Sequence, residues 1–333
     1  MTPLPGARAV TVGEVAERLR AEQRVLAVSH EAPDGDAVGS VVALILMCDR
    51  LGIPCGAYIP GDAPLPEEYG FLPRLGEVLR GSPPAVESPT TVYLLDCASL
   101  GRSNSGAPGA EGVVRVNIDH HHDNPGYGEL NLLDASAPST TALLYQVFKA
   151  GRLPVDKEIA TALYVGLVTD TGRFQYSNTT PWAHLMAKEL QESGVDVVQV
   201  YREVYESVPL PKLRLLGRAL QRAEAHAGGT VVAAWLAEED FTAAGATEGH
   251  TEGLVDVLRQ AKGARVAVLA RMKRQDGRPV TKVSLRSLDG GVDVSAIARQ
   301  RGGGGHVQAA GFTAEEELAE VLSWTVGQAV ERL

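Results

Sequence analysis

Apolar and polar residues are arranged in two ways along the first half of the chain, as short apolar runs and as longer stretches with helical spacing. Short apolar runs bounded by turn residues predict buried strands, and apolar positions recurring every three to four residues predict amphipathic helices. The predicted strands span 24–29, 92–95 and 113–118, and the predicted helices span 37–51, 139–150, 156–169 and 183–192. This alternation indicates an α/β domain with a parallel sheet and flanking helices.

The pattern changes after Gly228–Gly229, where strands become more frequent. A helix predicted over 211–225 would connect the two parts of the chain. The predicted elements beyond it are strands over 230–236, 265–272 and 281–287 and a helix over 251–260. We therefore expect an N-terminal catalytic domain over 1–208, a helical connector over 209–227 and a smaller C-terminal α/β domain over 228–333, with a cleft between the domains.

The composition agrees with two globular domains. Of the 333 residues, 44% are hydrophobic and 22% charged, so each part can bury a core. No apolar run reaches the roughly 20 residues of a membrane helix, and the N-terminus lacks the pattern of a signal peptide. The three cysteines, without a C-x-x-C pair, favour a reducing compartment. We expect a cytoplasmic protein without a membrane partner.

Charge is distributed unevenly. The formal net charge of −10 argues against a protein that coats long nucleic acid. Residues 257–301 nevertheless carry a net charge of +8, so the rest of the chain carries −18. This distribution suits an enzyme that binds cations in its acidic part and a small anion in its basic part. A solvated basic surface is the alternative interpretation.

Residues that commonly bind metals follow the three predicted strands of the first half. His30 follows the first strand, Asp96 ends the second, and His120 follows the third. Because ligands of open parallel sheets bind beyond the carboxyl ends of the strands, we expect these side chains to meet at one edge of the sheet. Taken singly, Asp96 could simply begin a turn.

Three further carboxylates extend this set. Asp34 and Asp36 flank Gly35, which would let the loop turn so that both carboxylates face inward. Asp36 also stands at the start of a predicted helix, where an aspartate often caps the helix. Asp170 ends an apolar helical run, and its alternative role is that of a turn residue.

The candidate ligands combine carboxylate with imidazole, which suits Mn²⁺, Fe²⁺, Co²⁺ or Zn²⁺. The absence of thiolate favours Mn²⁺, with Mg²⁺ or Co²⁺ as alternatives. They are His30, Asp34, Asp36, Asp96, His120 and Asp170. Two divalent ions about 3.5–4 Å apart activate water and neutralise the charge that develops on a phosphoryl group. The sequence therefore predicts a two-metal phosphoesterase.

At this point the motifs resemble those of a known superfamily, the DHH phosphoesterases, whose signature is similar to Asp119-His120-His121. The segment from His30 to Ala37, together with Asp96 and Asp170, resembles its other motifs. The Gly302–His306 segment, followed by Ala309-Ala310-Gly311, resembles the associated DHHA1 domain. Length and layout are most similar to the nanoRNase/pAp phosphatase (NrnA) group.

The resemblance implies a role for each residue of the site. One metal would be held by His30, Asp34 and Asp96, and the second by Asp36, Asp96, His120 and Asp170, with Asp96 bridging the two. Asp119 would orient His120, as carboxylates commonly do for metal-bound imidazoles. His121 would face the scissile phosphate, so we expect Asp96, Asp119 and His121 to be catalytic.

Substrate contacts are expected mainly in the C-terminal domain. Consecutive glycines let backbone N–H groups approach a phosphate, and His306 can add a hydrogen bond, although a glycine run is also typical of a flexible turn. The expected contacts are Arg102, Asn124, Arg286, Ser287, Gly303, Gly304, Gly305 and His306.

The resemblance implies an exonuclease that degrades short RNA or DNA oligonucleotides to mononucleotides and removes the 3′-phosphate of pAp. The enzymatic alternatives are a pyrophosphatase, a RecJ-like single-strand exonuclease and a phosphodiesterase of linear or cyclic dinucleotides. A non-catalytic nucleotide-binding protein is an alternative from another class. The sequence leaves open whether the chain is a monomer or a homodimer.

Overall fold

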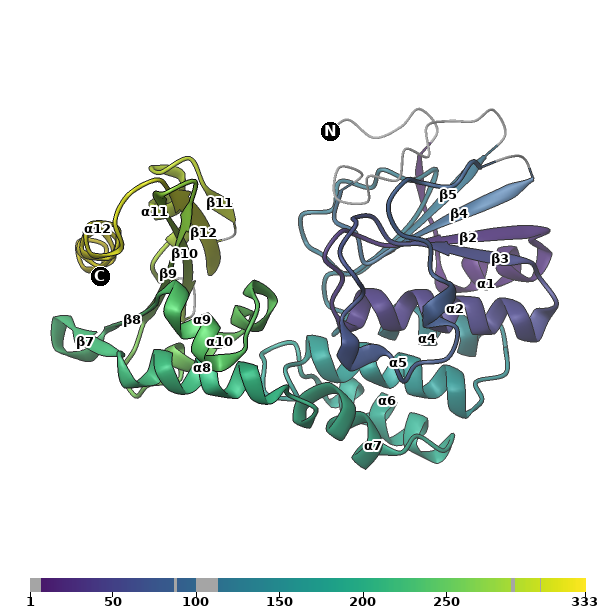
Figure 1. The fold of residues 1–333 in the computed structure, drawn as a ribbon. Helices are drawn as coiled ribbons and strands as arrows, with labels where there is room; N and C mark the ends of the chain where they lie inside the picture. The colour runs from purple at the N-terminus through teal and green to yellow at the C-terminus, as the bar shows by residue number, and fades with distance from the viewer. Residues whose placement is uncertain (1–6, 87–88, 100–112, 289–290, 306) are drawn as a thin grey trace. The chain divides into compact units, whose positions relative to one another are not determined.

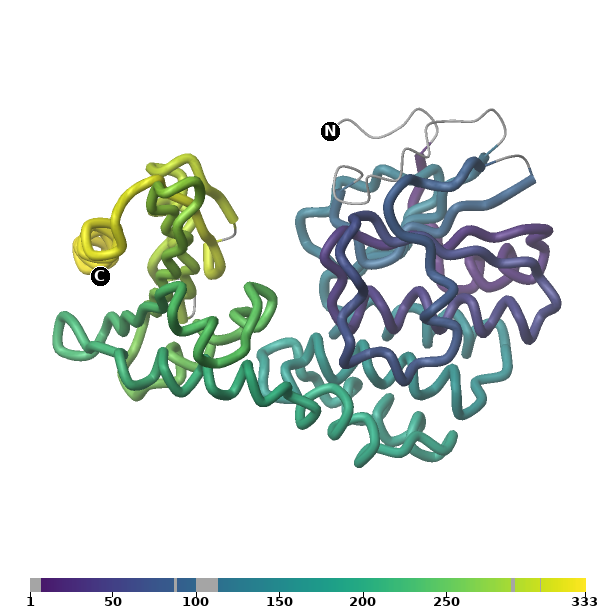
Figure 2. Tube along the Cα trace, in the orientation of Figure 1, coloured from purple at the N-terminus to yellow at the C-terminus, as the bar shows by residue number. Residues whose placement is uncertain are grey.

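The computed structural model describes residues 7–86, 89–99, 113–288, 291–305 and 307–333. The chain forms two compact units, Met1–Ser207 and Val208–Leu333 (Figures 1 and 2). Each unit contains its own sheet and its own hydrophobic core. Among the described residues, no helix combines the length and apolar character needed to cross a lipid bilayer.

The first unit contains six strands with helices between and after them. Its strands are β1 (Arg8–Ala9), β2 (Arg24–Val28), β3 (Cys55–Tyr58), β4 (Thr90–Leu95), β5 (Val114–Asp119) and β6 (Leu130–Leu133). Its α-helices are α1 (Val12–Ala21), α2 (Gly35–Leu51), α4 (Thr140–Ala150), α5 (Lys157–Asp170), α6 (Pro181–Glu192) and α7 (Val197–Tyr201). Short 3₁₀ or π turns cover Glu67–Tyr69, Leu75–Glu77 and Arg202–Glu206.

The strands of the first unit form one sheet in the order β1-β6-β5-β4-β2-β3. All of its strand pairs are parallel, so the predicted parallel sheet with flanking helices is confirmed. Figure 1 shows α2, α4 and α5 together on one side of this sheet. Because the strands run in the same direction, their carboxyl ends lie along one edge.

The two faces of this sheet bury different residues. Val25 and Ala27 of β2 belong to the large core shared with the helices, whereas Leu26 and Val28 belong to a smaller cluster on the other face. Alternate residues of a strand point to opposite faces, which explains the continuous apolar run of β2. A sheet buried on both faces gives the loops at its edge a rigid base.

Helices α2 and α5 approach each other closely because three glycines lie between them. A Cβ atom on Gly39 would lie 2.5 Å from the carbonyl oxygen of Ala162, and one on Gly35 would lie 2.6 Å from Cγ2 of Thr169. On the α5 side, a Cβ atom on Gly166 would lie 2.5 Å from Oδ1 of Asp36. The missing side chains therefore bring the N-terminal end of α2 against the C-terminal end of α5.

The second unit contains a six-stranded sheet in the order β11-β12-β10-β9-β8-β7. Its strands are β7 (Glu224–His226), β8 (Val231–Leu236), β9 (Val266–Gln275), β10 (Arg278–Ser287), β11 (Gly304–Gly305) and β12 (Ala309–Ala314). Its α-helices are α8 (Leu210–Gln221), α9 (Glu238–Ala244), α10 (Leu254–Arg259), α11 (Val294–Arg299) and α12 (Leu318–Val330), with 3₁₀ turns at η4 (Ala227–Gly229) and η5 (Glu248–Thr251). The second unit thus combines a sheet with helices, which confirms the predicted α/β fold class.

Helices cover both faces of the second sheet. Residues of α11 and α12 pack on one face, and residues of α8, α9 and α10 pack on the other. Leu215 and Ala219 of α8 are buried in the second of these cores, so α8 is part of the second unit. The helix predicted over 211–225 is too long, because Glu224–His226 form the edge strand β7 instead.

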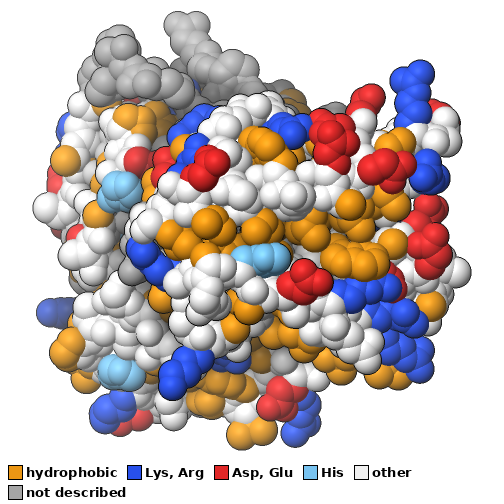
Figure 3. Space-filling view, turned by 90° about the vertical axis from the view of Figure 1, so that its left-hand side faces the viewer, with side chains coloured by type: hydrophobic (Ala, Val, Ile, Leu, Met, Phe, Trp, Pro, Cys, Tyr) orange, Lys and Arg blue, Asp and Glu red, His pale blue; other side chains and the backbone are white. Residues whose placement is uncertain are grey.

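A groove of about 650 Å³ lies beside β7 and β8 in the second unit. Trp235, Leu322 and Val326 contribute apolar walls, and Glu224 and His226 contribute polar groups. Figure 3 shows the face of the second unit that carries α12 and β7. Hydrophobic side chains are grouped there among charged ones. Edge strands of this kind are commonly kept short and charged, which limits pairing with other chains.

Candidate metal centre

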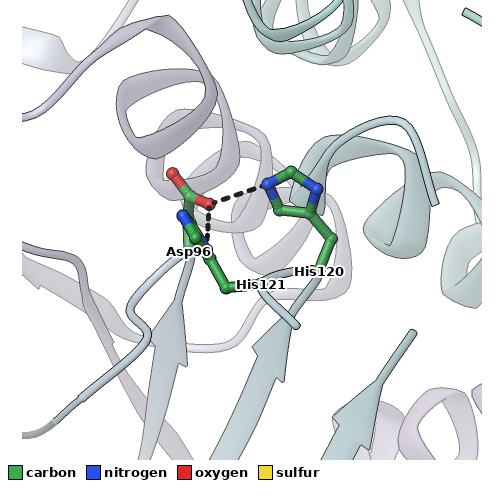
Figure 4. A group of neighbouring side chains, drawn as sticks. All are labelled: Asp96, His120 and His121. Atoms are coloured by element: carbon green, nitrogen blue, oxygen red, sulfur yellow. Dashed lines mark ion pairs between the residues drawn. The ribbon is translucent and has the colours of Figure 1, made fainter. Parts of the chain in front are cut away.

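Three parallel strands deliver polar side chains to one edge of the first sheet. His30 lies two residues beyond β2, Asp96 directly follows β4, and His120 directly follows β5. The side chains of Asp96, His120 and His121 point toward one another (Figure 4). The structure therefore brings together the residues that the sequence places at the ends of these strands.

Asp96 occupies the middle of this group, and its two carboxylate oxygens face different partners. Oδ2 lies 3.6 Å from Nε2 of His30, whereas Oδ1 lies 3.6 Å from Nε2 of His120. The residue has a φ of 54°, a left-handed conformation that is uncommon for residues other than glycine and recurs at functional sites. This conformation lets a fully buried carboxylate point between two sets of side chains.

The loop after β2 supplies two further carboxylates. Asp34 is the N-cap of α2, and its Oδ1 accepts hydrogen bonds from the backbone N–H groups of Asp36 and Ala37 at 3.1 Å each. The capping role considered for Asp36 is therefore wrong, because Asp36 lies inside the first turn of the helix. Gly35 has no positive φ; the close contact with Thr169 is what requires a glycine there.

The buried carboxylate of Asp36 is held by the N-terminal end of α4. The N–H of Thr140 donates to Oδ2 at 2.6 Å, and the N–H and hydroxyl of Thr141 donate to Oδ1 at 3.0 and 2.8 Å. The hydroxyl of Thr140 also donates to Oδ1 of Asp96 at 3.1 Å. Sequence analysis missed both threonines, although a run of hydroxyl residues at a helix start is a recognisable signal for anion contacts.

Asp170 ends α5 and faces the same group of side chains. Its Oδ2 lies 3.6 Å from Nε2 of His120. Asn178 folds back onto it, and its Nδ2 lies 3.1 Å from the backbone oxygen of Asp170, 3.3 Å from Oδ2 of Asp170 and 2.9 Å from the carbonyl of Pro138. Sequence analysis also missed Asn178, whose contact with Asp170 depends on the turn between them.

The ligand atoms fall into three overlapping groups in which all atoms lie within 4.8 Å of one another. The groups are His30, Asp34 and Asp96; Asp36, His120 and Asp170; and Asp96, His120 and His121. All six ligands predicted from the sequence are included, and His121 is an additional member. Carboxylate and imidazole together suit divalent first-row metals.

The protonation preferences of these carboxylates also fit a cation site. Burial, and then repulsion from Asp96 and Asp34, raises the pKa of Asp170 to about 8. Burial, followed by repulsion from Asp96 and Asp170, raises the pKa of Asp36 well above its usual value. Carboxylates that cannot all ionise together without compensation are stabilised by bound positive charge. The residues present therefore fit a metal centre.

Asp119 contacts His121, and the expectation that it orients His120 is wrong. Its Oδ1 lies 2.7 Å from Nδ1 of His121, whereas Nδ1 of His120 lies 3.3 Å from the carbonyl oxygen of Ala137. The hydrogen bond with Asp119 outweighs burial and raises the pKa of His121 to about 9. The backbone turns after β5. His121 therefore folds back onto the carboxylate of Asp119, whereas His120 faces the loop before α4.

Asn124 is engaged inside the protein. Its Nδ2 donates to Oδ2 of Asp119 at 2.6 Å and lies 3.2 Å from the carbonyl oxygen of Cys97. Its Oδ1 accepts from the Asn117 amide and from the backbone N–H of Gly126. These contacts give Asn124 a part in holding Asp119, in addition to the substrate contact expected from the sequence.

The remaining predicted substrate residues lie in the second unit or outside the described residues. Arg286 donates from Nε to Asp256 at 3.1 Å, and the hydroxyl of the buried Ser287 faces the carbonyl of Val307. Gly303 precedes β11, which consists of Gly304 and Gly305. Arg102 and His306 lie outside the described residues.

The parallel sheet, the clustered carboxylates and imidazoles at its carboxyl edge and the second α/β unit together define a metal-dependent phosphoesterase. The family model described as the DHH family, N-terminal domain, matches residues 24–167, and the DHHA1 domain model matches residues 228–331. The chain belongs to the DHH/DHHA1 phosphoesterase family.

Individual proteins agree with this assignment. The chain is 38% identical over 302 residues to the bifunctional oligoribonuclease and PAP phosphatase NrnA of Thermus thermophilus, covering 90% of this chain and 87% of that protein. It is 28% identical over 186 residues to a probable manganese-dependent inorganic pyrophosphatase of Streptococcus mutans, covering 52% of this chain and 57% of that protein. The crystal structure of an exopolyphosphatase-related protein from Bacteroides fragilis has the same fold, with a TM-score of 0.85, 23% identity and coverage of 96% and 95% of the two chains.

Proposed function

We propose that this protein degrades short oligonucleotides to mononucleotides and removes the 3′-phosphate of pAp. The observation that carries the proposal is the position of Asp96, whose two oxygens face His30 on one side and His120 on the other. A carboxylate shared in this way suits two divalent ions about 3.5–4 Å apart. The similarity to a protein named oligoribonuclease and PAP phosphatase supports the choice of substrate.

The metal ions that we propose are two Mn²⁺, with Mg²⁺ or Co²⁺ as alternatives. Six ligands that are all carboxylate or imidazole favour Mn²⁺, and a similar protein is named a manganese-dependent pyrophosphatase. When bound, the ions would polarise a water molecule and neutralise charge on the phosphoryl group. One ion would be held by His30, Asp34 and Asp96, and the other by Asp36, Asp96, His120 and Asp170.

The residues around the ligands would prepare the site for reaction. Asp119 binds the Nδ1 side of His121, which leaves Nε2 as the nitrogen available to a phosphoryl oxygen. A protonated His121 would donate a hydrogen bond or a proton to oxygen as the phosphorus–oxygen bond of the leaving nucleotide breaks. Thr140 and Thr141 would hold Asp36 in place during this step.

The second unit would hold the part of the substrate away from the cleaved bond. Its positive segment, residues 257–301, offers cationic side chains to an oligonucleotide that is too short to need a long binding surface. The nucleotide-binding alternative without catalysis is disfavoured because the ligand set is complete.

A timed digestion tests the substrate assignment. Labelled RNAs of graded length, from the dinucleotide upward, are incubated with the Mn²⁺-loaded protein, and pAp is assayed in parallel. We expect rates that fall as the chain lengthens and release of phosphate from pAp. Equal rates on dinucleotides and long single strands, or no phosphate from pAp, would contradict the proposal.

The catalytic role of the shared carboxylate is tested with Asp96→Ala and with a matched exposed carboxylate, Asp123→Ala. We expect the first variant to lose nearly all hydrolysis and the second to keep it, because Asp96 faces both groups of ligands. Mn²⁺ bound per chain is measured by equilibrium dialysis. Full hydrolysis by Asp96→Ala would remove the basis of the proposal.

A further inference from the structure

A cationic pocket of about 390 Å³ lies on the sheet of the second unit, separate from the metal centre and the glycine-rich loop. Strands β9 and β10 form its floor, and η5 and the start of α10 form its wall. The side chains that line it include Glu248, Thr251, Arg271, Lys282, Ser284 and Arg286. The charged side chains of the lining are three cations, Arg271, Lys282 and Arg286, and two acids, Glu248 and Glu252, so the pocket has a small net positive charge.

Arg271 is a buried cation whose hydrogen-bonding capacity is only partly used. Arg271 is only 8% exposed to solvent. Nη1 donates to the hydroxyl of Thr251, and Nη2 donates to Oγ of Ser284 at 2.9 Å. Nε is buried without a hydrogen-bond partner among the described atoms, and the acid facing the guanidinium, Glu248, lies 3.4 Å away. A buried guanidinium normally pairs fully, so the unpaired Nε–H and the 3.4 Å contact with Glu248 leave the charge of Arg271 incompletely compensated.

The strand register places a second cation directly opposite the first. Arg271 and Lys282 are Cα partners in the antiparallel pair of β9 and β10, so their side chains point to the same face. Like charges directly opposite each other destabilise a strand pair. Lys282 forms no ion pair with any described residue and is exposed at the pocket. An anion bound between the two side chains would relieve this repulsion.

Neutral donors complete the site. Oγ of Ser284 accepts from Arg271, which leaves the Ser284 hydroxyl hydrogen available to donate. Gly249 and Gly253 also line the pocket, so a ligand can approach the backbone there. A guanidinium, an ammonium and a hydroxyl at one concave position match the acceptor oxygens of a phosphate group.

We propose that this pocket is a second anion site that binds a phosphate of the substrate other than the one being cleaved. The inference rests on the proposed function for the identity of the ligand. It adds Arg271, Lys282 and Ser284 to the residues that recognise substrate. A substrate with two or more phosphates would then bind more tightly than one with a single phosphate.

The pocket is distinct from the glycine-rich loop. Ser284 of β10 pairs with Gly311 of β12, and Gly311 pairs with Gly304 of β11. The two sites are thus separated by two strand spacings, roughly 10 Å. Arg271 and Glu248 lie on the opposite side of β10 from the loop. One oligonucleotide can contact both places only with different phosphates.

Glu248 occupies part of the same site and would compete with the ligand. Its carboxylate lies 3.4 Å from Arg271 and 2.9 Å from Nζ of Lys273. The Glu248 residue is only partly buried, so its side chain can move away when a phosphate enters. Removing its charge should therefore strengthen phosphate binding, whereas removing the Lys282 charge should weaken it.

Kinetics on substrates that differ by one phosphate test the proposal. KM is measured for the dinucleotides ApA and pApA with the wild type, Lys282→Gln and Glu248→Gln. We expect the ratio of KM for pApA to KM for ApA to rise roughly tenfold in Lys282→Gln, the effect of one charge-assisted hydrogen bond, and to fall in Glu248→Gln. Lys212→Gln, a lysine of the same unit that lies outside the pocket and outside residues 257–301, should leave the ratio unchanged.

Binding to the metal-free protein separates this inference from the proposed function. Titration calorimetry with pAp and with AMP should show weaker pAp binding in Lys282→Gln and tighter binding in Glu248→Gln. If the wild type cleaves no oligonucleotide but these shifts occur, the pocket stands and the proposed activity falls. If both variants leave pAp binding and the KM ratio unchanged, the pocket proposal is overturned.

Inorganic phosphate distinguishes a substrate subsite from a site for a free ion. The rate on ApA is measured with and without added phosphate in the wild type and in Lys282→Gln. We expect the same response in both proteins, because ApA has no second phosphate to displace. A response to phosphate that disappears in Lys282→Gln would assign the pocket to free phosphate and overturn the substrate assignment.

Discussion

Thr141 donates two hydrogen bonds to one oxygen of Asp36, from its backbone N–H at 3.0 Å and from its hydroxyl at 2.8 Å. Thr140 binds the other oxygen through its N–H. A proposed metal ligand on α2 is therefore anchored to the N-terminal end of α4, where backbone N–H groups and the helix dipole favour negative charge.

The first prediction concerns this anchor. Thr141→Val keeps the shape of the side chain and removes the hydroxyl from a buried acceptor. We expect the free energy of unfolding to fall by about 1–3 kcal/mol and Mn²⁺ binding to weaken. Chemical denaturation and Mn²⁺ titration measure the two effects. Thr161→Val is the matched control, since the Thr161 hydroxyl bonds only to a carbonyl of its own helix.

The second prediction concerns the contact between α2 and α5. Gly166→Ala would place a Cβ atom 2.5 Å from Oδ1 of Asp36 and even closer to Cγ2 of Thr141, so these side chains or α5 itself must shift. We expect a loss of stability of about 1–3 kcal/mol or more, with loss of metal binding. In Gly217→Ala, a Cβ atom would meet no atom within 4 Å, and replacing a helical glycine should stabilise the protein by up to about 1 kcal/mol. Equal effects of the two substitutions on unfolding would contradict this interpretation.

The third prediction concerns pH. Burial and neighbouring carboxylates raise the pKa of Asp170 to about 8, above the ordinary value of 3.8 for an aspartate. The folded protein then retains a proton that the unfolded chain releases, so the Asp170 contribution to stability falls as pH rises from about 4 to about 8. Asp170→Asn should therefore raise the melting temperature of the metal-free protein more at pH 8 than at pH 5. With Mn²⁺ present we expect Asp170→Asn to lower the melting temperature, because the variant lacks a metal ligand.

The fourth prediction concerns Asp119, whose carboxylate raises the pKa of His121. Asp119→Asn should lower this pKa, so the acidic group in the pH–rate profile should shift to lower pH. We expect kcat to fall by about 10²–10⁴-fold while Mn²⁺ binding is largely kept. An unchanged profile with normal kcat would exclude His121 as an acid positioned by Asp119. Asp123→Asn, an exposed carboxylate nearby, serves as the control.

The sequence predicted what depends on local pattern. Strand β2 is a short, continuous apolar run, and His30 and Asp96 follow strand ends, so the edge where they meet could be inferred from the topology of parallel sheets. The helices α4 and α5 were predicted to within about one residue at each end, because apolar periodicity and flanking glycine or proline define them.

Contacts between distant segments could not be predicted in this way. Thr141 reaches Asp36 across about a hundred residues, and Asn178 reaches Asp170 through a turn containing Arg173 and Phe174 in left-handed conformations. Residues 224–226 were predicted to extend a helix, but pairing with β8 makes them a strand. In each case tertiary contacts decide the outcome, and local propensity is too weak to show it.

The backbone contact between α2 and α5 has a bearing on how the protein would respond to chelation. Asp36 and Asp170 are carried by two helices that meet at Gly35, Gly39 and Gly166, where an added Cβ atom would lie within 2.5 Å of a neighbouring atom. Removing the ions should therefore leave the positions of these ligands nearly unchanged. We expect slow amide hydrogen exchange along both helices whether or not Mn²⁺ is present, and rapid recovery of activity when the ion is returned.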